Sequence, residues 1–112
     1  MITQINANQF NGQVTSSAVP VLVEFFSDHC HYCQLLLPIL AEIAAERPDA
    51  LRIFKFDAGQ EPQFASRFRI TSVPNLVLFH AGGPIAQRSG FSPKRDLLAW
   101  IDSVLRPATP VR

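Results

Sequence analysis

Residues 19–34 read VPVLVEFFSDHCHYCQ and contain the only two cysteines of the chain, Cys30 and Cys33. The run at 19–26 is β-branched and aromatic and is too short for a typical helix, so it predicts a buried strand. The apolar run that follows, to about residue 47, predicts a helix. The two thiols therefore lie where a strand leads into a helix N-terminus, whose free N–H groups and dipole stabilise a thiolate. A Cys-x-x-Cys pair in this place is typical of redox chemistry.

The length and composition indicate a single globular domain. The chain has 112 residues, is 47% hydrophobic and 17% charged, and carries a formal net charge of +1. We place the domain at residues 1–105 and a flexible tail, with two prolines, at residues 106–112. The near-neutral charge gives no argument for nucleic-acid binding. We expect a monomer that binds neither nucleic acid nor membranes.

The N-terminus lacks the basic region and apolar core of a signal peptide, and no apolar stretch is long enough to span a bilayer. We therefore expect a cytoplasmic location. In that reducing compartment, two cysteines indicate catalysis or metal binding rather than a structural disulfide.

The rest of the pattern predicts alternating strands and helices. Pro38 should kink the long helix, because it lacks an N–H and its ring clashes with the preceding turn. Parallel strands with helical crossovers fit the first half of the chain, and a hairpin fits the second. The expected strands lie at 2–5, 51–57, 75–79 and 85–88, and the expected further helices at 8–15 with Asn8 as N-cap, at 62–68, and after Ser92 as N-cap with Pro93 at the first helical position.

With these elements in place, the chain resembles the thioredoxin family over about residues 2–105. Residues 21–34 are similar to the family's active-site segment, and Pro38 to its helix proline. Val73-Pro74 is similar to its cis-proline loop, and Gly90 to the glycine after its last strand. The resemblance implies an α/β thioredoxin fold, with a central mixed sheet of four to five strands flanked by helices on both faces.

The resemblance also implies an activity, that of a thiol-disulfide oxidoreductase acting on protein disulfide or dithiol substrates. Cys30 is the expected attacking thiolate and Cys33 the resolving thiol. Glu24 takes the place of the family's buried aspartate, which accepts a proton from the resolving thiol. Val73 and Pro74, with Gly90, are the expected substrate-binding residues. No bound cofactor is needed, and a thioredoxin reductase or glutathione would recycle the protein.

The site departs from the family pattern at several positions. His31 and Tyr32 replace the usual Gly-Pro between the cysteines, and His29 replaces the tryptophan before them. We expect these three residues to tune the reduction potential, since a histidine that stabilises the thiolate makes the couple more oxidising. Phe26 stands at the position of the family's second tryptophan. We expect Ile53 to occupy the position of the lysine that often accompanies the buried aspartate.

Two other functions stay open at this point. The first is a redox-inactive thioredoxin-fold module that binds a partner through Val73-Pro74. The second is a metal or iron–sulfur carrier that uses His29, Cys30, His31 and Cys33, which are residue types found in zinc sites. Adjacent residues at a helix start diverge in direction, so all four side chains do not easily converge on one ion; a site of Cys30, Cys33 and one histidine, or a cluster shared by two chains, stays open. A more ordinary interpretation is also open for Glu24 and His31, as solvated side chains without a role in the chemistry.

Overall fold

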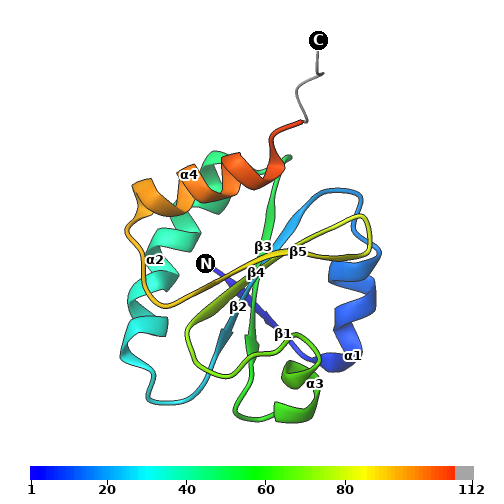
Figure 1. Cartoon of the computed structure of the whole chain (residues 1–112), viewed down its shortest axis with the longest axis vertical. Helices are drawn as coiled ribbons and strands as arrows, with labels where there is room; N and C mark the ends of the chain where they lie inside the picture. Colours follow the sequence, from blue (N-terminus) through cyan, green and yellow to red (C-terminus); the bar gives the residue numbers. More distant parts are fainter. Residues whose placement is uncertain (108–112) are drawn as a thin grey trace.

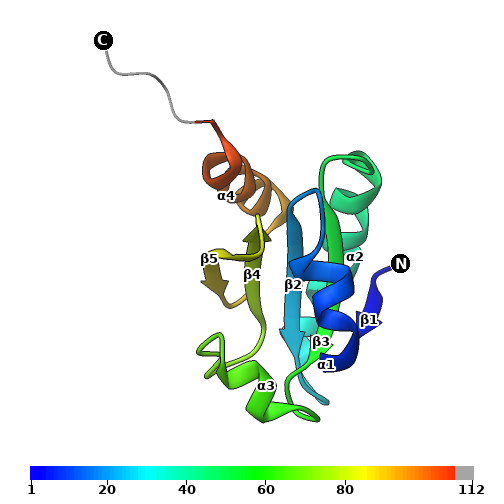
Figure 2. The same ribbon diagram turned by 90° about the vertical axis from the view of Figure 1, so that its right-hand side faces the viewer.

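The computed structural model describes residues 1–107, in which a five-stranded mixed sheet is covered by helices on both faces (Figure 1, Figure 2). The strand order is β1-β3-β2-β4-β5, with β1, β3 and β2 parallel. Strand β4 runs antiparallel to β2, and β5 antiparallel to β4. The expected α/β architecture of the thioredoxin fold is thus confirmed. The strands are β1 (Thr3–Ile5), β2 (Val21–Phe26), β3 (Arg52–Asp57), β4 (Asn75–His80) and β5 (Gly83–Ser89).

The helices form two layers, one on each face of the sheet. In Figure 1, α2 and α4 lie to the left of the strands, whereas α1 and α3 lie to the right. The long helix α2 contains Pro38 and continues through it. No helix within residues 1–107 is long and apolar enough to cross a membrane. The helices are α1 (Ala7–Phe10), which continues into the π-helical segment η1 (Asn11–Thr15), α2 (His31–Glu46), α3 (Pro62–Ser66) and α4 (Lys94–Leu105).

The alternation of side chains along the central strand β2 divides the core in two. Leu22 points toward α2 and α4 and packs with Leu36, Leu40 and Ile101 among others. Val21, Val23 and Phe25 point to the opposite face and pack with a cluster of phenylalanines. Because Glu24 alternates with Phe25, its carboxylate is directed into the α2 face, where the disulfide-bearing helix begins.

Phe10 is at the centre of the aromatic half of the core. Its ring lies 4.9 Å from Phe64, 5.4 Å from Phe68 and 5.3 Å from Phe79, measured between ring centroids. These rings come from α1, from α3 and the loop that follows it, and from β4, so one aromatic cluster holds two separate segments against the sheet. The short helices are stabilised by this packing, since helices of four or five residues are not stable alone.

Two predicted helix caps are wrong. The first helix is capped by Asn6 and not by Asn8: the Asn6 side chain accepts from the Gln9 N–H at 3.1 Å, and the Gln9 side chain accepts from the Asn6 N–H at 2.9 Å. This reciprocal capping box satisfies two backbone donors at once. The last helix has Pro93 as N-cap, because the Ser92 hydroxyl instead accepts from Arg88 Nε at 3.0 Å.

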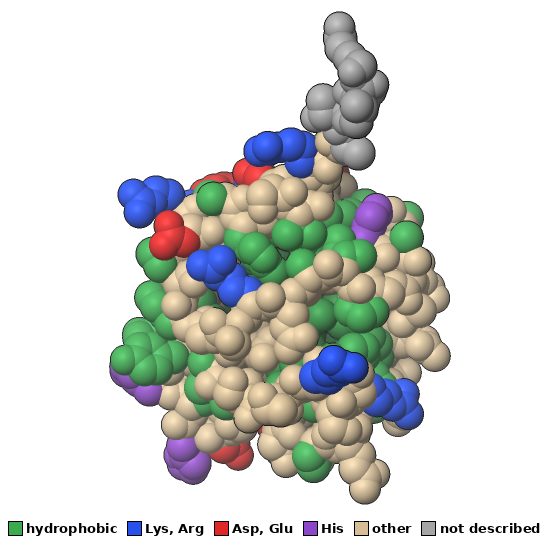
Figure 3. All heavy atoms as spheres, viewed as in Figure 1, with side chains coloured by type: hydrophobic (Ala, Val, Ile, Leu, Met, Phe, Trp, Pro, Cys, Tyr) green, Lys and Arg blue, Asp and Glu red, His purple; other side chains and the backbone are tan. Residues whose placement is uncertain are grey.

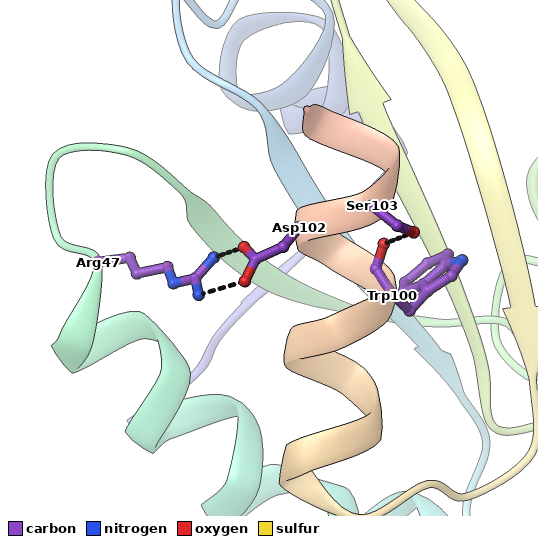
Figure 4. Close-up of polar contacts among 4 residues, drawn as sticks. All are labelled: Arg47, Trp100, Asp102 and Ser103. Carbon is purple, nitrogen blue, oxygen red and sulfur yellow. Dashed lines mark hydrogen bonds and ion pairs between the residues drawn. The ribbon is translucent and has the colours of Figure 1, made fainter. Parts of the chain in front are cut away.

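Ion pairs join α4 to the end of α2. Arg47 contacts both carboxylate oxygens of Asp102, as Figure 4 shows, and the longer of the two contacts is 3.1 Å. Lys94 contacts Glu42 at 3.2 Å and also contacts Glu46. These pairs lie on the surface, where solvent screens them, so they contribute little to stability. Of the predicted tail, residues 108–112 lie outside the described residues.

Candidate redox site

Cys30 and Cys33 form a disulfide at the first turn of α2, with an S–S distance of 2.18 Å and a Cα–Cα distance of 5.3 Å. Cys30 is the N-cap residue of α2, and its sulfur accepts a hydrogen bond from the Cys33 N–H at 3.2 Å. Cys30 is half-buried, whereas Cys33 is only 3% exposed. The more exposed of the two cysteines is therefore the one whose sulfur accepts a backbone N–H of the helix start, which favours a thiolate there.

The loop between β2 and α2 positions this sulfur. Strand β2 ends at Phe26, and after three intervening residues Cys30 caps α2. His29 has a φ of 64°, which lies in the left-handed region and is uncommon for a residue other than glycine. This backbone turn at His29 directs the chain from the strand into the helix axis within a few residues.

The three residues expected to tune the potential are all exposed. His31 and Tyr32 are the first two residues of α2, and their ring centroids lie 5.5 Å apart. Tyr32 is 57% exposed. His29 lies in the preceding loop. Within residues 1–107, the structure brings together no group of three or more histidine, cysteine, aspartate or glutamate side chains that could hold a metal ion.

The predicted substrate-binding residues lie at the same end of the sheet as the disulfide. The Val73–Pro74 peptide bond is cis, and Asn75, the next residue, pairs with Phe25 of β2. Gly90 has a φ of 83°, which glycine adopts without strain, and its N–H donates to the Pro74 carbonyl at 2.9 Å. The sheet register thus brings the cis-proline loop and Gly90 next to the end of β2.

Glu24 is buried beneath the disulfide. It is 1% exposed, and neither carboxylate oxygen has a hydrogen-bond partner. It lines a pocket of about 200 Å³ together with Cys33, His29 and Lys55, among others. Burial raises the pKa of Glu24 from 4.5 to about 8, and the charge of Lys55 partly opposes this shift. Near neutral pH the folded protein therefore holds Glu24 mostly in its protonated form.

The prediction that Ile53 occupies the position of the accompanying lysine is wrong. Ile53 lies opposite Leu22 and belongs to the apolar core. The parallel register of β2 and β3 instead places Lys55 opposite Glu24. Lys55 Nζ lies 5.5 Å from the centre of the Phe26 ring, at the rim of the Glu24 pocket. The lysine beside the buried carboxyl is therefore present in this chain as Lys55, which lies opposite Glu24 and acts on it through its charge and not through a hydrogen bond.

Sequence reasoning also missed Phe91. This residue directly follows Gly90, is 41% exposed, and has its ring centroid 6.1 Å from that of Tyr32. Its proximity to the disulfide depends on the return of β5 to the end of the sheet where α2 begins. A signal for it was present in the sequence, since a large aromatic residue directly follows the glycine matched to the family.

Comparison with known proteins agrees with this geometry. The thioredoxin family model matches residues 1–103. A thioredoxin from Acidithiobacillus ferridurans is 38% identical over 104 residues, which cover 93% of this chain and 96% of that protein. A thioredoxin from Rickettsia prowazekii (strain Madrid E) is 31% identical, with 91% and 97% covered.

A third relative is longer than this chain. It is the bifunctional thioredoxin reductase/thioredoxin of Mycobacterium leprae (strain TN), 33% identical over 102 residues that cover 91% of this chain and 22% of that protein. Neither the binding module nor the metal carrier is favoured by these relatives. A matching family model over nearly the whole described chain, with a Cys-x-x-Cys disulfide at the expected helix start, establishes that this protein belongs to the thioredoxin family.

Proposed function

We propose that this protein catalyses thiol-disulfide exchange with protein substrates, with Cys30 as the attacking residue. The observation that carries the proposal is the asymmetry of the pair: Cys30 is half-buried at the helix N-cap, whereas Cys33 is 3% exposed. In the reduced protein, the Cys30 thiolate attacks one sulfur of a substrate disulfide. A mixed disulfide forms, and the other substrate sulfur leaves as a thiolate, which takes a proton from water.

Cys33 then completes the exchange. Its thiolate attacks Cys30 Sγ, the Cys30–Cys33 disulfide forms, and the second substrate sulfur is released. The Cys33 proton must be removed first, and the ionised fraction of Glu24 is the base that we propose, because both residues line the same pocket and the Glu24 oxygens have no other partner. A carboxyl with a pKa of about 8 is matched to a thiol, whose ordinary pKa is about 8.5.

The substrate segment would lie extended along the cis-proline loop. Val73 is half-buried beside Pro74, and its backbone groups can pair with a substrate strand. Gly90 presents no side chain there, so a second backbone can approach closely. The reduction potential of the Cys30–Cys33 couple would be tuned by the neighbouring residues His29, His31 and Tyr32.

A recycling partner is part of the proposal. A thioredoxin reductase is our first candidate for the electron donor, and glutathione the second; the name of the Mycobacterium leprae relative joins a reductase and a thioredoxin in one chain. We propose that the protein works as a monomer in the cytoplasm, where such donors keep thiols reduced.

Turnover of a protein disulfide with dithiothreitol as electron donor tests the proposed function. We expect multiple turnovers by the wild-type protein and none by Cys30→Ser. Glu24→Gln should attack normally but resolve slowly in single-turnover kinetics, with Glu42→Gln, an exposed carboxyl on α2, as the matched control. Absence of turnover by the wild-type protein would favour a redox-inactive binding module instead.

A further inference from the structure

Three exposed large hydrophobic side chains lie on or next to the helix start that carries the disulfide, namely Tyr32, Leu35 and Phe91. The other exposed large hydrophobic residues within 1–107 are Met1 and Ile85. Tyr32 stands between the two cysteines, and Leu35 lies three residues further along α2, on the same face of the helix. Figure 3 shows hydrophobic side chains beside a histidine at the left of the molecule, over the first turns of α2. Such a patch on a soluble domain indicates a binding surface.

Tyr32 and Phe91 form an open aromatic pair. Their ring centroids are 6.1 Å apart and the ring planes are inclined by 45°. The two residues nevertheless stay 57% and 41% exposed, so the contact between them leaves much of both residues uncovered. Aromatic pairs are favourable at centroid distances of about 4.5–7 Å, so a third ring could add to this pair at the same spacing.

The position of the Tyr32–Phe91 pair determines which part of a bound substrate can contact it. Tyr32 is two residues from Cys30, and Phe91 follows Gly90, whose N–H is bonded to the Pro74 carbonyl at 2.9 Å. In the mixed disulfide the substrate cysteine is bonded to Cys30 Sγ. The residues next to that cysteine are therefore held at the helix turn that carries Tyr32, whose ring is paired with that of Phe91.

We propose that Tyr32 and Phe91 form a recognition surface for an aromatic side chain next to the substrate cysteine. This inference rests on the proposed function and names a substrate class for it: protein disulfides whose cysteine is flanked by phenylalanine, tyrosine or tryptophan. Tyr32 and Phe91 carry no charge, so a flanking carboxylate or ammonium gains nothing there and loses hydration. Aromatic contacts of this kind correspond to about a twofold to tenfold gain in rate constant.

The test compares two peptide disulfides that differ only in the residue next to the cysteine, phenylalanine in one and serine in the other. The second-order rate constant for reduction by the reduced protein is measured for each. We expect wild-type protein to prefer the phenylalanine peptide by about threefold to tenfold. Phe91→Ser should reduce the preference to below about twofold, and Phe91→Leu should give an intermediate value because it retains apolar area.

Two controls separate recognition from other effects. Ile85→Ser removes an equally exposed apolar side chain, 46% exposed, near the start of β5, and should leave the preference unchanged. The glutathione equilibrium constant of Phe91→Ser should equal that of the wild type, since Phe91 is proposed to recognise substrate and not to set the potential.

The peptide comparison separates failure of the proposed function from failure of the recognition surface. If the wild type reduces neither peptide, the proposed function itself fails. If it reduces both peptides equally well, or if Phe91→Ser and Phe91→Leu keep the full preference, the proposed function stands and the recognition surface is refuted.

Discussion

Glu24 and Lys55 lie opposite each other where the parallel strands β2 and β3 pair, one side chain buried and the other at the pocket rim. Desolvation raises the pKa of Glu24 to about 8, and the Lys55 charge limits the rise. The protonation of Glu24, the proposed base for Cys33, thus depends on its own burial and on the charge of Lys55. This relationship yields two of the predictions below.

Glu24 should make the stability of the folded protein fall as the pH rises. Its folded pKa of about 8 exceeds the unfolded value of 4.5, so between these values the folded state keeps a proton that the unfolded chain releases. The free energy of unfolding therefore decreases from about pH 4.5 to about pH 8 and then levels off, by up to about 5 kcal/mol in total. Urea unfolding of the disulfide form at several pH values measures this slope.

Glu24→Gln should lose that slope and should be more stable than the wild type at pH 9. Glu42→Gln, with its carboxyl exposed on α2, should keep the slope of the wild type. An equal pH dependence in wild type and Glu24→Gln would mean that Glu24 is solvated and ionises normally.

Lys55→Met should raise the pKa of Glu24 further. The charge of Lys55 favours the ionised carboxylate, so its removal leaves desolvation unopposed. NMR titration of the Glu24 side-chain carboxyl in both proteins measures the shift. Lys94→Met removes a lysine that is paired with Glu42 and Glu46, and it should leave the Glu24 titration unchanged. A titration that is the same in Lys55→Met and wild type would contradict the electrostatic coupling.

The two cysteines should give opposite phenotypes. Cys30→Ser should lose disulfide exchange by at least about a hundredfold, because the buried Cys33 cannot reach a substrate. Cys33→Ser should accumulate mixed disulfides with substrate, since only the second thiol can release a complex bound through the first. Mass spectrometry of the products under non-reducing conditions detects these complexes. Stable complexes of Cys30→Ser, with normal turnover by Cys33→Ser, would reverse the assigned roles.

The Cys30–Cys33 couple should be more oxidising than that of an ordinary thioredoxin. We expect a reduction potential above about −270 mV and toward about −200 mV, because His31 follows Cys30 in place of glycine and a histidine there should stabilise the reduced thiolate. Equilibration with glutathione buffers measures the value. His31→Gly should lower it, whereas His80→Gly, an exposed histidine at the end of β4, should not. A wild-type potential at or below about −270 mV would refute this prediction.

Local patterns in the sequence were enough to predict most of the fold. The apolar run before Cys30 and the leucine-rich run after it identified β2 and α2, because strand and helix periodicities are properties of consecutive residues. The spacing of Cys30 and Cys33 at their junction predicted the redox pair for the same reason. The helix caps were predicted less well, since Asn6 and Asn8 are both good capping residues and the choice between them depends on where the preceding strand ends.

Contacts between distant segments could not be predicted in this way. Lys55 faces Glu24 only because β3 pairs with β2 in one register, and a shift of two residues would have placed Ile53 there. Phe91 meets Tyr32 only because β5 returns to the end of the sheet where α2 begins. The sequence by itself determined that the cysteine pair stands where a strand leads into a helix, through local spacing. Tertiary structure decided their burial, their partners and hence their protonation, because these depend on packing between strands and helices far apart in the chain.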